Sequence, residues 1–146
     1  MSWTGGCQCG AVRYRLHADP VGSNVCHCRM CQKAGGGPFM AFAGVKLAEL
    51  VWTRGAPKVF ASSDFAERGF CSDCGTPLTY RARSHDRIAV TTGSLDQAGD
   101  APPEKQFGSE SKLPWADAIS SLPVRDFTAA INGRGIHSHQ HPDHET

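Results

Sequence analysis

The amino-acid sequence predicts a small all-β domain with short strands and little helix. Short apolar segments alternate with turn residues at close spacing, and none has the long apolar stripe of an amphipathic helix. The 146 residues include 16 glycines and nine prolines, an excess of turn formers over average usage. With only 8% aromatic residues, a domain of this size would gain from a covalent or metal staple.

The first expected strand starts directly after a cysteine pair. Val12, Tyr14 and Leu16 alternate with Arg13 and Arg15, and this period of two is typical of a half-buried strand. The other expected strands cover residues 39–43, 51–53, 58–61, 68–71, 78–80 and 88–92. Short helical turns are expected at 29–34, before a glycine triplet, and at 115–121.

Length and charge exclude several classes of function. A chain of 146 residues is about one domain long. Its net charge of +1 shows no excess of basic residues for binding nucleic acid. The longest apolar stretch, residues 38–45, is too short to span a membrane, and the N-terminus does not resemble a signal peptide. We therefore expect a soluble cytoplasmic protein with no nucleic-acid or membrane partner.

The seven cysteines fall into three clusters and favour metal binding over disulfides. The clusters are Cys7-x-Cys9, Cys26-x-Cys28-x-x-Cys31 and Cys71-x-x-Cys74. An odd number of closely paired cysteines is typical of zinc ligands, whereas disulfide frameworks prefer even numbers and scattered positions. Free thiolates also fit a reducing compartment.

Two of the pairs are followed by glycine, at Gly10 and Gly75. A zinc knuckle turns tightly so that backbone N–H groups point at the sulfurs, and glycine permits the positive φ that this turn often needs. The two pairs therefore resemble the halves of one closed four-sulfur structural site.

The middle cluster has three cysteines and no following glycine. Three protein ligands with an open fourth position are typical of a catalytic zinc. The alternative is a second structural site completed by a histidine, either His17 or His85. Spacing alone also permits a ribbon-type site made from Cys28-x-x-Cys31 and Cys71-x-x-Cys74, which would leave three cysteines over.

Seven motifs occur in the order found in one known family. They are Gly5-Gly6-Cys7-Gln8-Cys9-Gly10, Cys26-His27-Cys28-Arg29-Met30-Cys31, Gly37-Pro38-Phe39, Thr53-Arg54-Gly55, Arg68-Gly69-Phe70-Cys71-Ser72-Asp73-Cys74-Gly75-Thr76-Pro77-Leu78, Gly93-Ser94-Leu95-Asp96 and Leu113-Pro114-Trp115. Together they make residues 5 to about 124 resemble the glutathione-dependent formaldehyde-activating (GFA) family, whose domain centromere protein V shares.

The resemblance implies a β-tent zinc fold with two zinc sites. By motif position, the structural zinc would be held by Cys7, Cys9, Cys71 and Cys74. The second zinc, at the active site, would be held by Cys26, Cys28 and Cys31. The family's activity is the condensation of formaldehyde with glutathione to S-(hydroxymethyl)glutathione, which is classed in reverse as a carbon-sulfur lyase reaction.

The first functional hypothesis is therefore a zinc-assisted addition of a thiol to an aldehyde. Glutathione sulfur would enter the open position of the second zinc as thiolate and attack formaldehyde or a related small aldehyde. His27 is a candidate proton donor by its pKa range, although a histidine between two ligands could instead form only a structural hydrogen bond. The candidates to pair with glutathione carboxylates are Arg29, Lys33, Arg54 and Arg68.

A second hypothesis is a non-catalytic module that uses zinc for structure and binds a thiol or a partner. A third is redox sensing, in which oxidation would link cysteines and release zinc. The GFA-like domain is expected over residues 1–132. Residues 133–146, which carry four of the seven histidines, are expected to form a disordered tail.

Overall fold

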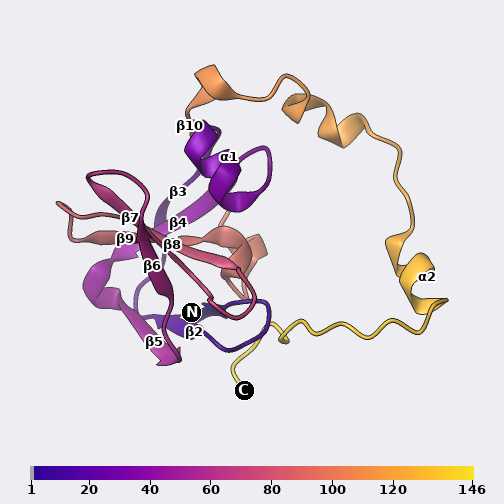
Figure 1. Ribbon diagram of the computed structural model, residues 1–146, viewed down its shortest axis with the longest axis horizontal. Helices are drawn as coiled ribbons and strands as arrows, with labels where there is room; N and C mark the ends of the chain where they lie inside the picture. Colours follow the sequence, from indigo (N-terminus) through magenta and orange to yellow (C-terminus); the bar gives the residue numbers. More distant parts are fainter. Residues whose placement is uncertain (1) are drawn as a thin grey trace.

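The computed structural model describes residues 2–146 and places ten strands in two sheets (Figure 1). In spatial order, the three-stranded antiparallel sheet contains β1 (Trp3–Gly6), β2 (Arg13–Leu16) and β5 (Leu50–Arg54). The seven-stranded sheet contains β10 (Lys105–Phe107), β3 (Val21–Cys26), β4 (Met40–Lys46), β9 (Arg87–Thr91), β8 (Pro77–Ala82), β7 (Ala66–Phe70) and β6 (Lys58–Ala61). The prediction of a mostly β fold is confirmed.

The helical segments are short. The two α-helices are α1 (Arg29–Gly35) and α2 (Phe127–Asn132). The 3₁₀ turns are η1 (Leu47–Glu49), η2 (Thr92–Ser94), η3 (Ala98–Asp100), η4 (Ser109–Ser111) and η5 (Ala116–Ser121). Helix α1 ends at the predicted glycine triplet, where Gly36 adopts a left-handed φ of 69°.

Two apolar cores support the sheets. The main core includes Tyr14, Val45, Leu78 and Val90, each at most 2% exposed. Although its ring is buried, the Tyr14 hydroxyl is satisfied by a 2.8 Å hydrogen bond to Ser94. A smaller core contains the buried side chains Cys31, Met40 and Phe42.

One strand pairing in the larger sheet joins distant parts of the chain. Strand β10 pairs with β3 in parallel, which places Lys105 opposite Asn24 and Phe107 opposite Cys26. The other pairings in this sheet are antiparallel. The parallel pairing therefore brings residues beyond 100 to the end of β3, where the middle cysteine cluster begins.

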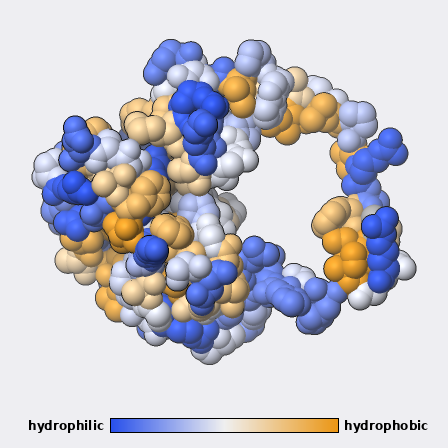
Figure 2. All heavy atoms as spheres, viewed as in Figure 1, coloured by the Kyte–Doolittle hydropathy of each residue, from blue (hydrophilic) through white to orange (hydrophobic). Residues whose placement is uncertain are grey.

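After η4, the chain leaves the domain as an extended arm that passes through α2 and returns beside β2 (Figure 1). Trp115, Leu122 and Phe127 are exposed along it, and Figure 2 shows apolar surface on the arm. At the end of the tail, Glu145 lies 3.6 Å from both Arg13 and Arg15. The domain boundary expected at residue 132 and the disorder of the tail both stay predictions.

Among residues 2–146, no helix is both long and apolar enough to cross a membrane.

Candidate metal centres

The first cysteine cluster joins two loops that are far apart in the sequence. Cys7 and Cys9 follow β1, and Cys71 and Cys74 follow β7. All four sulfurs lie within 4.8 Å of one another, with Cys9 Sγ 3.6 Å from Cys7 Sγ and 3.9 Å from Cys71 Sγ. Tetrahedral zinc with Zn–S bonds near 2.3 Å places its sulfurs roughly 3.8 Å apart. The four thiols therefore fit one zinc ion.

Backbone geometry explains why both loops converge on the same point. Gly10 and Gly75 both have φ of +78°, and their N–H groups donate to the carbonyls of Cys7 and Cys71. This confirms the predicted glycine conformation in both knuckles. The Val12 N–H also donates to Cys7 Sγ at 3.2 Å, as expected for a backbone turned toward a ligand sulfur.

The chemistry of these thiols favours a cation among them. All seven cysteines are free thiols. Burial raises the pKa of Cys74, but the hydroxyl and backbone N–H of Thr76 lower it overall to about 6. A backbone hydrogen bond with Ala11 lowers the pKa of Cys9, yet desolvation and the neighbouring thiols raise it overall to about 12. Full ionisation of the cluster thus needs a positive charge at its centre, as a bound metal provides.

The second cluster lies where β3 passes into α1. Cys26 ends β3, Cys28 is the N-cap of α1, and Cys31 is in its first turn. The three sulfurs lie within 4.8 Å of one another. Cys28 Sγ accepts a hydrogen bond from the Cys31 N–H at 3.4 Å, so the helix start itself positions two of the ligands. Three thiols in this arrangement fit a zinc with three protein ligands.

The structure groups the cysteines in one of the ways that spacing leaves open. Among residues 2–146, no fourth Cys, His, Asp or Glu joins the three sulfurs within that distance, so neither His17 nor His85 completes the site. The four sulfurs of the ribbon-type alternative, Cys28, Cys31, Cys71 and Cys74, do not lie together, because the last two cluster with Cys7 and Cys9.

A cavity of about 270 Å³ opens onto the three sulfurs. Its walls are mainly apolar or aromatic, and they include Met30, Phe42, Tyr80 and Phe107. The one formally charged side chain in the lining, the cysteines aside, is Arg68. The site is therefore an apolar chamber with thiols and one cation, large enough for a small thiol and an aldehyde.

Arg68 is 5% exposed and has no carboxylate within 4 Å among the described residues. Its Nη2 donates to Cys31 Sγ at 3.3 Å, and its Nε donates to Ser62 Oγ at 2.9 Å. The guanidinium also lies 5.0 Å from the centre of the Tyr80 ring. A buried cation needs an anionic partner, and the nearest candidate is the cysteine cluster as thiolate.

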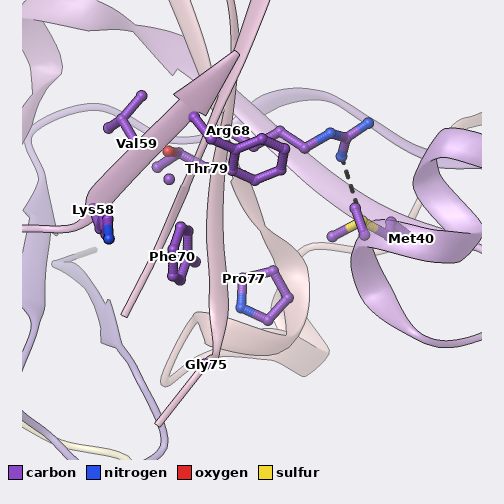
Figure 3. Close-up of a pocket in the computed structure, with 11 residues that line it drawn as sticks. Met40, Lys58, Val59, Arg68, Phe70, Gly75, Pro77 and Thr79 are labelled. Atoms are coloured by element: carbon purple, nitrogen blue, oxygen red, sulfur yellow. Dashed lines mark hydrogen bonds between the residues drawn. The ribbon is translucent and has the colours of Figure 1, made fainter. Parts of the chain in front are cut away.

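Figure 3 shows Arg68 extending from β7 toward Met40, whose Sδ lies 3.5 Å from Nη1. A separate cavity of about 380 Å³ lies on this side of the sheet, with Val59, Phe70 and Pro77 among its lining residues. Because Arg68 lines both cavities, its side chain forms part of the boundary of each.

The other predicted site residues lie away from the cysteine cavity. Arg29 donates to Gln32 at 2.6 Å and Lys33 is exposed on α1. Arg54 donates to the Gly10 carbonyl and to Thr146, beside the four-cysteine cluster. Of the four basic candidates, only Arg68 lines the cavity.

His27 is buried behind the cluster. Its Nε2 pairs with Gln106 Oε1 at 3.0 Å, and its ring packs edge-on against Phe39. It does not line the cavity onto which the three sulfurs open. This placement favours the structural alternative for His27, and a catalytic role stays a prediction.

Sequence reasoning missed the aromatic walls of the cavity. Tyr80 was expected only as a strand residue, and no strand was expected at Phe107. The hydrophobic pattern of a strand identifies which residues are buried but not which cavity they line. Their placement depends on the order of strands in the sheet, which no local motif encodes.

Comparison with known proteins agrees with this geometry. The sequence profile of a family described as glutathione-dependent formaldehyde-activating enzyme matches residues 2–110. The chain belongs to the GFA family. The matched region contains both cysteine clusters and ends before the Leu113-Pro114-Trp115 motif.

Two relatives extend this result. A Schizosaccharomyces pombe protein named an uncharacterized lyase is 35% identical over 78 residues, which cover 53% of this GFA chain and 56% of the relative. The chain thus matches only about half of that relative's length. A Halomonas elongata protein, named provisionally as a glutathione-dependent formaldehyde-activating enzyme, is 29% identical over 133 residues, covering 84% and 85% of the two chains.

The fold is also found in a solved structure. A Rhodobacter sphaeroides protein superposes with a TM-score of 0.58 at 22% identity, covering 71% of this chain and 99% of the other. At this identity the likeness concerns the fold alone.

Proposed function

We propose that this GFA protein adds a thiol, most suitably glutathione, to formaldehyde or a related small aldehyde, and catalyses the reverse reaction. The observation that carries the proposal is the cavity at Cys26, Cys28 and Cys31, where no fourth protein ligand is present among the described residues. The family match and the names of the relatives support the same chemical class.

The reaction needs no oxidant or reductant. The substrate S–H gives up its proton, and the sulfur forms a bond to the carbonyl carbon. The π-electron pair of the carbonyl moves to its oxygen, which gains a proton to become a hydroxyl. The reverse reaction breaks the carbon-sulfur bond, as in a carbon-sulfur lyase.

The three cysteines would hold zinc, which would keep a substrate thiol in its nucleophilic thiolate form. Arg68 places a buried positive charge against Cys31 and so stabilises the anionic state of the site. Phe42, Tyr80 and Phe107 give the cavity aromatic walls, and low polarity strengthens the attraction between the guanidinium and the thiolates. Confinement of both reactants supplies the remaining advantage over reaction in water.

We assign His27 a positioning role within this proposal. Its backbone N–H donates to the Phe107 carbonyl at 2.8 Å, and its ring pairs with Gln106. Both contacts hold β10 against the end of β3, and Phe107 of β10 forms one wall of the cavity. His27 therefore supports the chamber without touching its contents.

The test is a comparison of enzymatic and spontaneous rates, because thiols add to formaldehyde unaided. Exchange between free glutathione and its S-hydroxymethyl adduct is measured by NMR with and without the zinc-loaded protein. We expect wild-type protein to accelerate exchange, whereas exchange in the presence of Cys28→Ser should proceed at the spontaneous rate. Glutathione binding without acceleration would contradict catalysis and favour the non-catalytic thiol-binding module.

A further inference from the structure

A wide basic groove continues from the cysteine cavity. It has a volume of about 610 Å³ and shares four lining residues with the cavity: Asn24, Tyr80, Ala89 and Phe107. Its other walls carry His85, Arg87 and Lys105. No acidic side chain lines either space among the described residues, so the groove and the cavity form one continuous, cationic surface.

Two glycines show where the charged ends of Arg87 and Lys105 lie. A Cβ added to Gly44 in β4 would lie 3.2 Å from Nη2 of Arg87, and one added to Gly22 in β3 would lie 3.7 Å from Nζ of Lys105. The guanidinium and the ammonium therefore lie over the backbones of two neighbouring strands. At these two positions, glycine places no side chain between the cation and the strand backbone.

Neither cation is neutralised by a carboxylate. Among residues 2–146, no Asp or Glu oxygen lies within 4 Å of Arg87 or Lys105. By contrast, the nearby Arg81 and Arg83 both pair with Glu67 at 3.6 Å. The two groove cations are thus available for an anionic ligand, whereas the neighbouring arginines already have a partner.

The spacing fits a peptide thiol. Lys105 pairs with Asn24, two residues before Cys26, and its Nζ reaches Gly22, four residues before Cys26. At about 3.3 Å per strand residue, these positions lie roughly 7 to 13 Å from the cysteine cluster. An extended tripeptide is roughly 10 Å long, so a thiol at the cluster can place a terminal carboxylate in the groove.

We propose that Arg87 and Lys105 form a carboxylate-binding subsite that selects peptide thiols such as glutathione over neutral thiols. This inference rests on the proposed function for its ligand but not on turnover. It replaces Arg29, Lys33 and Arg54 as the binding partners of the carboxylates. The subsite makes charge-assisted hydrogen bonds, and because both side chains are exposed to solvent, each contribution is modest.

The experiment compares glutathione with its diethyl ester, which has the same thiol but no carboxylate. Binding of each to zinc-loaded wild type, Arg87→Gln, Lys105→Gln and the double variant is measured by calorimetry. Arg83→Gln and Lys58→Gln are the matched controls, because they remove one exposed charge each outside the groove. Turnover is recorded in parallel for every variant.

We expect each groove variant to weaken glutathione about fivefold and the double variant about twentyfold. The ester should bind the wild type about as weakly as glutathione binds the double variant, and the groove substitutions should leave ester binding unchanged. The same pattern with no turnover would support the subsite and refute catalysis.

Equal weakening of glutathione and its ester would overturn the subsite even if turnover persisted. Equal effects of the control and groove variants would also overturn it, because they would show only general attraction to a basic surface. Absence of glutathione binding to the wild type would overturn both proposals.

Discussion

The two cysteine clusters both consist of thiols, but they differ in their surroundings and in the role we assign to them. The four-cysteine cluster is part of the main core, where Cys7 and Cys71 pack with buried apolar side chains, and its four thiols are enough to fill a tetrahedral zinc site. The three-cysteine cluster borders the smaller core and opens onto a cavity. A closed set of ligands can only hold the chain together, whereas an incomplete set leaves a position for substrate.

The cations beside the clusters differ in the same way. Arg13, which shares a pocket with Cys7, donates two hydrogen bonds to Asp96, the shorter at 2.5 Å. Arg68 contacts Cys31 and has no carboxylate partner among the described residues. Arg13 beside the closed site is thus paired with a carboxylate, whereas Arg68 at the open site contacts a ligand sulfur without one.

The largest effect should follow from opening the closed cluster. Cys71→Ser removes one ligand and buries a hydroxyl in the main core, and loss of a structural zinc costs folding free energy. We expect a loss of stability on the order of 5 kcal/mol, together with loss of one zinc per chain. Thermal unfolding and metal analysis would show both. The exposed neighbour Ser72→Ala is the control, and a stable Cys71→Ser protein with two zincs would refute the assignment.

The corresponding change in the open cluster should spare the fold. Serine at position 28 keeps an N-cap for α1, since its hydroxyl can accept the hydrogen bond that Cys28 Sγ now accepts. We expect Cys28→Ser to lose the second zinc and at least about 100-fold in activity, with a circular dichroism spectrum like the wild type. If this variant unfolded, both clusters would be required for folding, and this would contradict the distinction between a structural and an open cluster.

The ion pair beside the closed cluster predicts a response to acid. Burial raises the pKa of Asp96, but the Arg13 guanidinium and the Thr4 hydroxyl lower it overall below its ordinary value of 3.8. A carboxyl with a lower pKa in the folded protein stabilises the fold above the unfolded value and loses this contribution as pH falls through the folded value.

Asp96→Asn should therefore destabilise the protein by about 3 kcal/mol near neutral pH. The difference in unfolding free energy between wild type and variant should narrow as pH falls below about 4. Denaturant unfolding at a series of pH values measures it. A difference that stays constant down to pH 2 would show that the pKa of Asp96 is the same in the folded and the unfolded protein, which would contradict a stabilising ion pair with Arg13.

Removal of the unpaired cation should weaken the open site alone. Arg68→Met leaves the thiolates without their buried positive charge, and we expect affinity for the second zinc to fall about tenfold. Competition with a chelator measures this affinity independently of activity. Arg81→Met, which removes a cation already paired with Glu67, should change it little; an equal loss in both variants would remove the specific role of Arg68.

The smallest effect should come from the histidine-rich tail. Its contacts with the domain include ion pairs at 3.6 Å from Glu145, hydrogen bonds from Arg54 to Thr146 and a backbone hydrogen bond from His141 to Gln8. Most of the groups that the tail supplies are exposed, and contacts of this kind contribute little. Deletion of residues 133–146 should change stability by less than about 1 kcal/mol and leave both zinc content and activity unaltered. Loss of zinc from the shortened chain would show that the tail supplies a ligand.

Local motifs were sufficient where the chain itself determines the geometry. The knuckle glycines, the strand at Lys58–Ala61 and the short helix after Cys28 were all predicted. Strands β1, β3 and β10 were not predicted, because they contain glycine, polar residues or only three residues. Pairing with neighbouring strands stabilises these segments despite their weak intrinsic preference.

The candidate site was likewise only partly predictable from the sequence. Spacing identified the cysteines as metal ligands in close pairs, but it left their grouping open, and the knuckle glycines and the family resemblance favoured the grouping into four and three. It could not distinguish Arg68 from the three other basic candidates, nor place Arg87 and Lys105 beside the cavity. The position of Lys105 follows from the pairing of β10 with β3, a contact between segments about 80 residues apart, and the positions of Arg68 and Arg87 follow from the order of β7 and β9 in the same sheet.

The central claim, one closed and one open metal site, is tested most directly by cadmium-113 NMR of protein loaded with two cadmium ions. We predict two signals, of which one shifts when glutathione is added and the other does not move. Cys28→Ser should retain only the signal that does not move. A single signal, or two signals whose chemical shifts do not change when glutathione is added, would contradict this claim.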